Sequence, residues 1–106
     1  MTHLIDLIGN TPLLRLEHIS RMVGANVFLK HKACNPFGSA LDRTAWGYLK
    51  QAAERGELGP GGCVVEASSG NFAISLAHLC AAMGCSLFIA MLRGRQTFRS
   101  SHAICH

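Results

Sequence analysis

Acidic residues are few in this chain and unevenly distributed. Among 106 residues there are six Asp or Glu and ten Lys or Arg, which gives a formal charge of +4. All six acids lie within the first 92 residues, whereas the last fourteen contain Arg93, Arg95 and Arg99 and no acid. The body is therefore nearly neutral and the tail is basic. Neither a broad basic face nor a groove-reading motif accompanies these arginines, so we expect no nucleic-acid binding.

The sequence has no CxxC pair, and its first residues do not have the pattern of a secretory leader. Its cysteines are odd in number, and no charged start is followed by an apolar run and a cleavage site. This pattern favours a reducing compartment, so we expect a cytoplasmic protein whose cysteines are mostly buried as small apolar side chains. His102, Cys105 and His106 could be considered as metal ligands. A closed zinc site needs four well-spaced ligands, so we predict no metal.

Formal charge is absent from Phe72 to Leu92, a run of 21 residues. Its length meets the criterion for a membrane-spanning helix, and the arginines that follow would suit a cytoplasmic anchor. The other interpretation is a buried helix, a turn at Gly84 and a buried strand. We favour this second interpretation and keep a small single-span membrane protein as an alternative.

The composition, 49% hydrophobic and 15% charged, is typical of one small globular domain. Pattern and turn residues predict an α/β fold with two N-terminal strands, a capped helix and one right-handed βαβ unit with parallel strands. The expected elements are strands at 13–16 and 25–30, a helix at 40–55, a buried strand at 63–67, a helix at 72–83 and a buried strand at 85–91.

A loop of turn residues precedes the predicted helix at 40–55. Ser39 and Asp42 have the spacing of a capping box, which predicts that the helix begins there, and Gly56 ends it. Apolar residues at helical spacing predict a buried stripe facing a core. The residues of this stripe are Leu41, Ala45, Tyr48, Leu49 and Ala52.

A second loop, Ser68 to Asn71, joins a predicted strand to a predicted helix. Unpaired backbone N–H groups and the positive end of the helix dipole meet at such a junction, so it suits a carboxylate. The alternative is that Ser69 or Asn71 simply caps the helix.

Four blocks of the sequence, in order, resemble the cysteine synthase family of fold-type-II enzymes that use pyridoxal phosphate (PLP). They are IGNTPLLRL at 8–16, NPFGSALDR at 35–43, AAERGELGPGG at 52–62 and EASSGNFA at 66–73. In that family the second block contains a lysine that forms a Schiff base with PLP, and here this position is Leu41. An isobutyl group supplies no amine. Lys30 and Lys32 are the nearest amines, and we interpret both as solvated charges rather than replacements.

The resemblance also implies roles for the second loop. In the family this loop binds the carboxylate of the substrate, and its Asn meets the ring hydroxyl of PLP. Four residues are carried over as substrate-binding candidates, the last also as a vestigial cofactor contact: Ser68, Ser69, Gly70 and Asn71. Phe72 and Ala73 replace a threonine and a glycine of the family pattern, and both changes weaken the site.

The resemblance covers about the first third of a family subunit. The family makes cysteine from O-acetylserine and sulfide, and its phosphate-binding loop and the residue facing the pyridine nitrogen come from later sequence that has no equivalent here. We therefore expect a truncated, silent relative at 1–92, followed by a basic non-family tail at 93–106. It has no catalytic residue and does not hold PLP covalently.

An alternative function is a module that binds a small carboxylate or a C-terminal peptide, such as the tail of serine acetyltransferase, which the family can receive. The strands near residues 13 and 27 would have sheet partners in longer relatives. We expect self-association because their edges and apolar faces are left open here.

Overall fold

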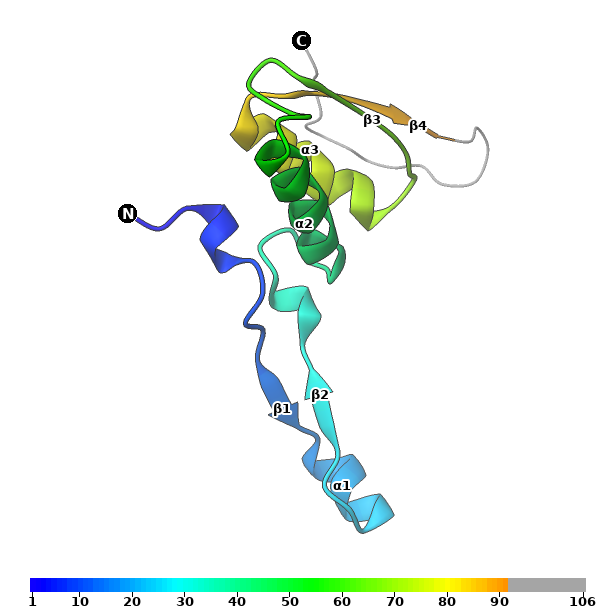
Figure 1. Cartoon of the computed structure of the whole chain (residues 1–106). Helices are drawn as coiled ribbons and strands as arrows, with labels where there is room; N and C mark the ends of the chain where they lie inside the picture. Colours follow the sequence, from blue (N-terminus) through cyan, green and yellow to red (C-terminus); the bar gives the residue numbers. More distant parts are fainter. Residues whose placement is uncertain (92–106) are drawn as a thin grey trace.

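A computed structural model of the chain describes residues 1–91 and divides them into an extended arm and a body (Figure 1). The predicted tail at 93–106 and its candidate metal ligands lie outside the described residues. The elements in order are η1 (Leu4–Leu7), β1 (Leu13–Arg15), α1 (Glu17–Val23), β2 (Phe28–Lys30), η2 (Lys32–Cys34), α2 (Leu41–Glu54), β3 (Cys63–Ala67), α3 (Asn71–Met83) and β4 (Ser86–Ala90).

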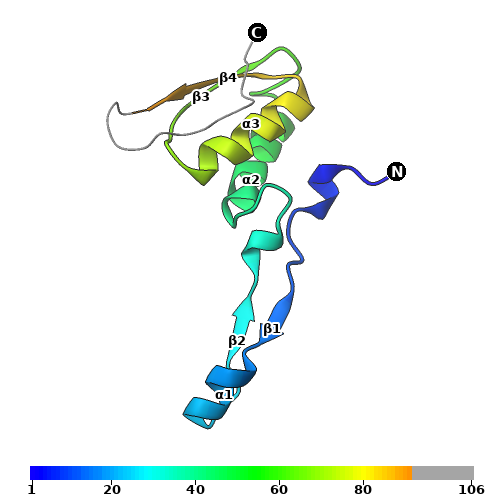
Figure 2. The same ribbon diagram turned by 180° about the vertical axis from the view of Figure 1, so that it is seen from behind.

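The arm consists of β1 and β2 with α1 at its tip, and it projects away from the other elements (Figure 2). The two strands are antiparallel, with Leu14 opposite Leu29. Gly24, with a φ of 67°, ends α1 in the left-handed conformation that glycine adopts without a Cβ clash. All three residues of each strand are exposed, so the arm contributes no buried side chain of its own sheet to a core.

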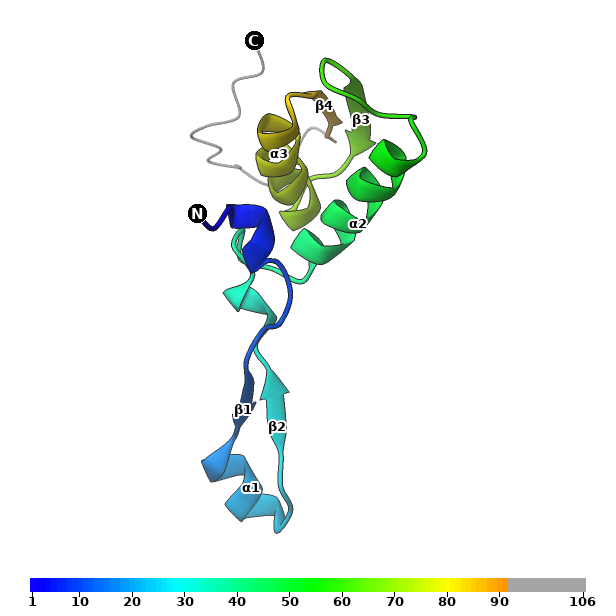
Figure 3. The same ribbon diagram turned by 60° about the vertical axis from the view of Figure 1, so that its left-hand side comes forward.

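The body contains the predicted βαβ unit. Strands β3 and β4 are parallel, with Val65 opposite Phe88, and α3 connects them. Helices α2 and α3 lie side by side and cover one face of this two-stranded sheet (Figure 3). The predicted α/β class is confirmed, and the charge-free stretch up to residue 91 contains a helix, a turn and a strand. Among residues 1–91, no helix is both long and apolar enough to cross a membrane.

One small apolar core holds the body together. Its buried members are Ala45, Leu49, Leu58, Leu76, Leu79, Cys80 and Leu87. The predicted stripe of α2 is correct at its centre. It is wrong at Leu41, which is 37% exposed, and at Tyr48, which is 66% exposed. Leu41 lies in the first turn, at the edge of the helix pair, and the Tyr48 ring instead meets Phe72 edge-on at 6.4 Å between centroids.

The prediction that β3 and β4 are fully buried strands is also wrong. Only the face toward the helices is covered, and side chains alternate between half-buried and exposed along β3. On the uncovered face, Val65 is 72% and Phe88 is 61% exposed. The cysteines also differ from expectation, since Cys63 of β3 and Cys34 of η2 are exposed and only Cys80 is buried among those described. Two strands and two helices make a sheet with a single covered face.

The radius of gyration, 17.1 Å, reflects the projecting arm. A compact domain of this length has a value of about 13 Å.

Candidate functional site

The loop between β3 and α3 carries the four predicted substrate-binding residues. Gly70 precedes α3 with an extended backbone, and no side chain caps the helix. The interpretation of Ser69 or Asn71 as a cap is therefore wrong. Ser68 instead turns inward, since its N–H donates to the Ala90 carbonyl at 3.2 Å and its hydroxyl lies 3.5 Å from the Gly70 N–H.

The exposure of this loop determines what it can bind. Ser69 and Asn71 are exposed, while Ser68 and Gly70 are half-buried. The first N–H groups of an α-helix have no partner within the helix, and the dipole adds a partial positive charge there. No side chain caps α3, so the N–H groups of its first turn suit a small anion such as a carboxylate.

Leu41 is the first residue of α2. The Ser39 hydroxyl accepts a hydrogen bond from its backbone N–H at 3.1 Å, so the sequence does start a helix at the predicted place. The side chain is 37% exposed and carries no nitrogen. At this position the chain can make van der Waals contacts but cannot form a covalent bond to a carbonyl carbon.

Asp42 does not form the predicted capping box with Ser39. Its carboxylate is fully buried and accepts two hydrogen bonds, from the Phe37 backbone N–H at 2.7 Å and from the Ser75 hydroxyl at 2.5 Å. Because Ser75 is one turn from the start of α3, this bond fixes the first turns of α2 and α3 next to each other. The structure therefore brings Leu41 and the Ser68–Asn71 loop to the same end of the helix pair (Figure 3).

Sequence reasoning missed the roles of Ser75 and Asn35. Ser75 is a polar residue in an otherwise apolar part of α3, and this contrast is the only feature of the sequence that indicates a buried hydrogen bond there. Asn35 had been assigned to a turn, yet it is buried, accepts a hydrogen bond from the Gly9 N–H at 2.8 Å and donates one to the Lys32 carbonyl at 2.7 Å. It thereby connects the IGNTPL block to the NPFGSALDR block.

No lysine replaces the missing amine at Leu41. The Lys30 ammonium group, at the end of β2, donates a hydrogen bond to the Thr11 carbonyl and so is engaged within the arm. Lys32 is exposed in η2. Among residues 1–91, the side chains at the predicted site do not fit a covalently held PLP. The loop offers backbone donors, and Asn71 offers an amide.

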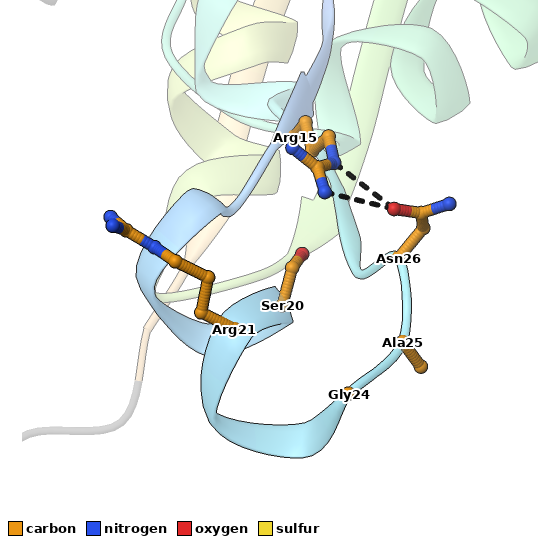
Figure 4. A pocket seen from close by; sticks show the side chains of 6 residues that line it. All are labelled: Arg15, Ser20, Arg21, Gly24, Ala25 and Asn26. Atoms are coloured by element: carbon orange, nitrogen blue, oxygen red, sulfur yellow. Dashed lines mark hydrogen bonds between the residues drawn. The ribbon is translucent and has the colours of Figure 1, made fainter.

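Two hollows in the described part of the chain lie elsewhere. One, of about 270 Å³, is at the tip of the arm and is lined by Arg15, Ser20, Arg21, Gly24, Ala25 and Asn26 (Figure 4). The Arg15 guanidinium there is already paired with Glu17 at 2.5 Å and Asn26 at 2.9 Å. The other, of about 420 Å³, lies between the N-terminal segment and α3. Neither is lined by Leu41 or by the Ser68–Asn71 loop. The described residues contain no cluster of three or more groups that could hold a metal.

Comparison with known proteins shows to which family the chain belongs. The model of the pyridoxal-phosphate dependent enzymes matches residues 4–100. Cysteine synthase 1 of Emericella nidulans is 49% identical over 88 residues, which are 83% of this chain and 24% of that protein. Cysteine synthase B of Escherichia coli is 41% identical over 91 residues, which are 86% of this chain and 30% of that protein.

Solved structures agree. The crystal structure of O-ureido-L-serine synthase superposes with a TM-score of 0.80 at 36% identity, over 86% of this chain and 28% of that one. A lysine-to-alanine variant of that enzyme with O-ureido-L-serine bound gives a TM-score of 0.79. The chain thus spans between about a quarter and a third of the length of these relatives. The resemblance noted in the sequence is confirmed, and the chain belongs to the family of pyridoxal-phosphate-dependent enzymes that includes the cysteine synthases.

Proposed function

We propose that this chain is a catalytically silent member of the cysteine synthase group that no longer holds PLP covalently. The observation that carries the proposal is Leu41. It stands at the position of the family lysine, on the first turn of a correctly formed α2, and its side chain has no amine.

The surroundings of Leu41 support the same conclusion. PLP, when bound in the family, supplies an electron sink for carbanion chemistry, and a lysine is needed both to hold it and to move a proton. Lys30 is engaged with Thr11 in the arm and is not available for that role. Phe72, which replaces a threonine of the family pattern, packs against Tyr48 rather than offering a hydroxyl. Asn71 remains as a hydrogen-bonding residue only, so any contact with PLP would be weak.

The test is borohydride reduction of the full chain mixed with PLP, followed by peptide mapping. We expect wild-type labelling only at the ordinary amines, which are the N-terminal amino group and Lys30, Lys32 and Lys50, in proportion to PLP concentration. The Leu41→Lys variant supplies an amine and should add a label at position 41, with Leu41→Gln as the matched control that adds polarity without an amine. None of the three proteins should form cysteine from O-acetylserine and sulfide. Cysteine formation by the wild-type chain with PLP would overturn the proposal.

A second candidate function is the binding of a small carboxylate or of the C-terminal carboxylate of a peptide. The uncapped start of α3 favours it, because no side chain bonds to the N–H groups of the first turn. The tail of serine acetyltransferase is the peptide suggested by the family. In such a complex we expect the terminal carboxylate to accept hydrogen bonds from the loop N–H groups.

Calorimetric titration tests this second candidate. The probe is a peptide with the sequence of that tail, and the control is the same peptide with its C-terminus amidated. We expect heat only from the free carboxylate, and we expect less of it with the Asn71→Ala variant. Equal signals from both peptides, or no heat at high peptide concentration, would exclude it. A cytoplasmic location remains a prediction that cell fractionation can check.

A further inference from the structure

A thiol and an imidazole meet at η2, away from the site described above. The Cys34 Sγ lies 2.9 Å from the His31 Nδ1, and Cys34 is exposed. A nucleophile within hydrogen-bond distance of a base is the arrangement used to activate thiols. We propose that Cys34, activated by His31, is a reactive thiol that undergoes exchange with small-molecule disulfides.

The backbone around this pair holds the two side chains in place. The Cys34 N–H donates to the His31 carbonyl at 3.2 Å, and the Asn35 N–H donates to the Lys32 carbonyl at 3.2 Å. The buried Asn35 side chain fastens the same turn to Gly9, 26 residues earlier in the chain. The backbone of this turn is therefore fixed by the fold, which keeps the two side chains within reach of each other.

The sequence around Cys34 is basic. Lys30, Lys32 and the half-buried His31 are the titratable residues directly before it in sequence, and no acid lies between Glu17 and Asp42. Reactive cysteines are found in exposed, electropositive surroundings of this kind.

The exchange balances as written. The Cys34 S–H bond breaks, its proton moves to Nδ1 of the neutral His31 ring, and the sulfur attacks one sulfur of the disulfide. The S–S bond of the reagent breaks, and its leaving thiolate takes up the proton from the imidazolium. Cys34 is oxidised to a mixed disulfide, and one half of the reagent is reduced to a thiol.

Cys63 provides an internal control in the same molecule. It is exposed like Cys34, but its sulfur lies 4.0 Å from the Val64 carbonyl, and among residues 1–91 no histidine bonds to it. Because both thiols are exposed, access alone does not explain a difference in rate between them. Reaction at Cys63 gives the rate of an ordinary exposed thiol.

The experiment treats the full chain with hydroxyethyl disulfide, a neutral reagent that lysines do not attract, and measures each cysteine by acid quench and peptide mapping. We expect Cys34 to react about tenfold faster than Cys63, the low end of what a positioned base contributes. The His31→Gln variant keeps a polar side chain without a base and should reduce the ratio to about one. His78→Gln, the matched control, should leave it unchanged, because His78 stacks on Phe37 at 4.5 Å and bonds to the Ile74 carbonyl.

A second measurement distinguishes geometry from local sequence. In concentrated urea the pair loses its fixed arrangement, so the ratio for the wild-type chain should also approach one. A folded His31→Gln protein with an unchanged ratio would overturn the proposal, as would a wild-type Cys34 that reacts no faster than Cys63.

Discussion

The arm and the body of this chain differ in what they can bury. In the body, Leu79 and Ala45 are fully buried between α2 and α3. In the arm, Leu13 is 62% and Phe28 is 53% exposed, although the two strands pair with correct register. Hydrogen bonding is thus satisfied in both regions, while apolar burial is confined to one. The comparison shows that the body has a core of its own, whereas the arm has paired strands and no core.

The largest expected effect is on the body core. Replacing Leu79 by alanine removes a fully buried side chain and leaves a cavity, so the free energy of unfolding should fall by about 2–5 kcal/mol. Urea unfolding followed by the fluorescence of Trp46, the single tryptophan, measures it, because Trp46 lies in α2 and packs against the core. Val65→Ala, on the uncovered face of β3, is the matched control. Equal losses from both variants would mean that α2 and α3 do not enclose the core.

The hydrogen bond between the two helices should have the next largest effect. Ser75→Ala leaves the buried Asp42 carboxylate without one of its two donors, at a cost of about 1–3 kcal/mol. Ser86→Ala, at an exposed position of β4, is the control and should change little. The same urea transition compares them. A Ser75→Ala protein as stable as the wild type would show that Asp42 finds another donor.

A smaller effect is expected at the open end of α2. Leu41→Lys puts a cation at the positive end of the helix dipole, which should lower the unfolding free energy by about 0.3–1 kcal/mol. Gln51→Lys, at an exposed position in the last turn, places the same cation at the negative end and should be neutral or slightly stabilising. Thermal unfolding at low salt gives both values. If the two variants shifted in the same direction, the dipole would not be the cause.

Much of the body follows from the sequence, because its determinants are local. Helical spacing places Ala45 and Leu49 in the core, and turn residues mark both ends of the βαβ unit. The missing amine at Leu41 can be predicted from the sequence, because this is the one position at which NPFGSALDR departs from the family pattern. The hydrogen bond from Ser75 to Asp42 joins residues 33 apart in sequence, so no local pattern reveals it. The spacing of Ser39 and Asp42 instead predicts a capping role for the same carboxylate. The burial of β3 does not follow from the sequence, because an apolar run does not show whether one or both faces of a strand are covered.

The smallest effect on stability is expected in the arm, and it is also the sharpest test of the comparison. The double variant Leu13→Ser, Phe28→Ser changes two exposed side chains, so the Trp46 transition of the body should move by less than about 0.5 kcal/mol. Exposed apolar surface promotes association, and sedimentation velocity should therefore show less self-association for this variant than for the wild type. Thr2→Ser, an exposed change outside both strands, controls for handling. A large loss of body stability in the double variant would show that the arm and the body fold as one unit. Both positions are exposed in the arm, so they could affect the core only through contacts between the arm and the body.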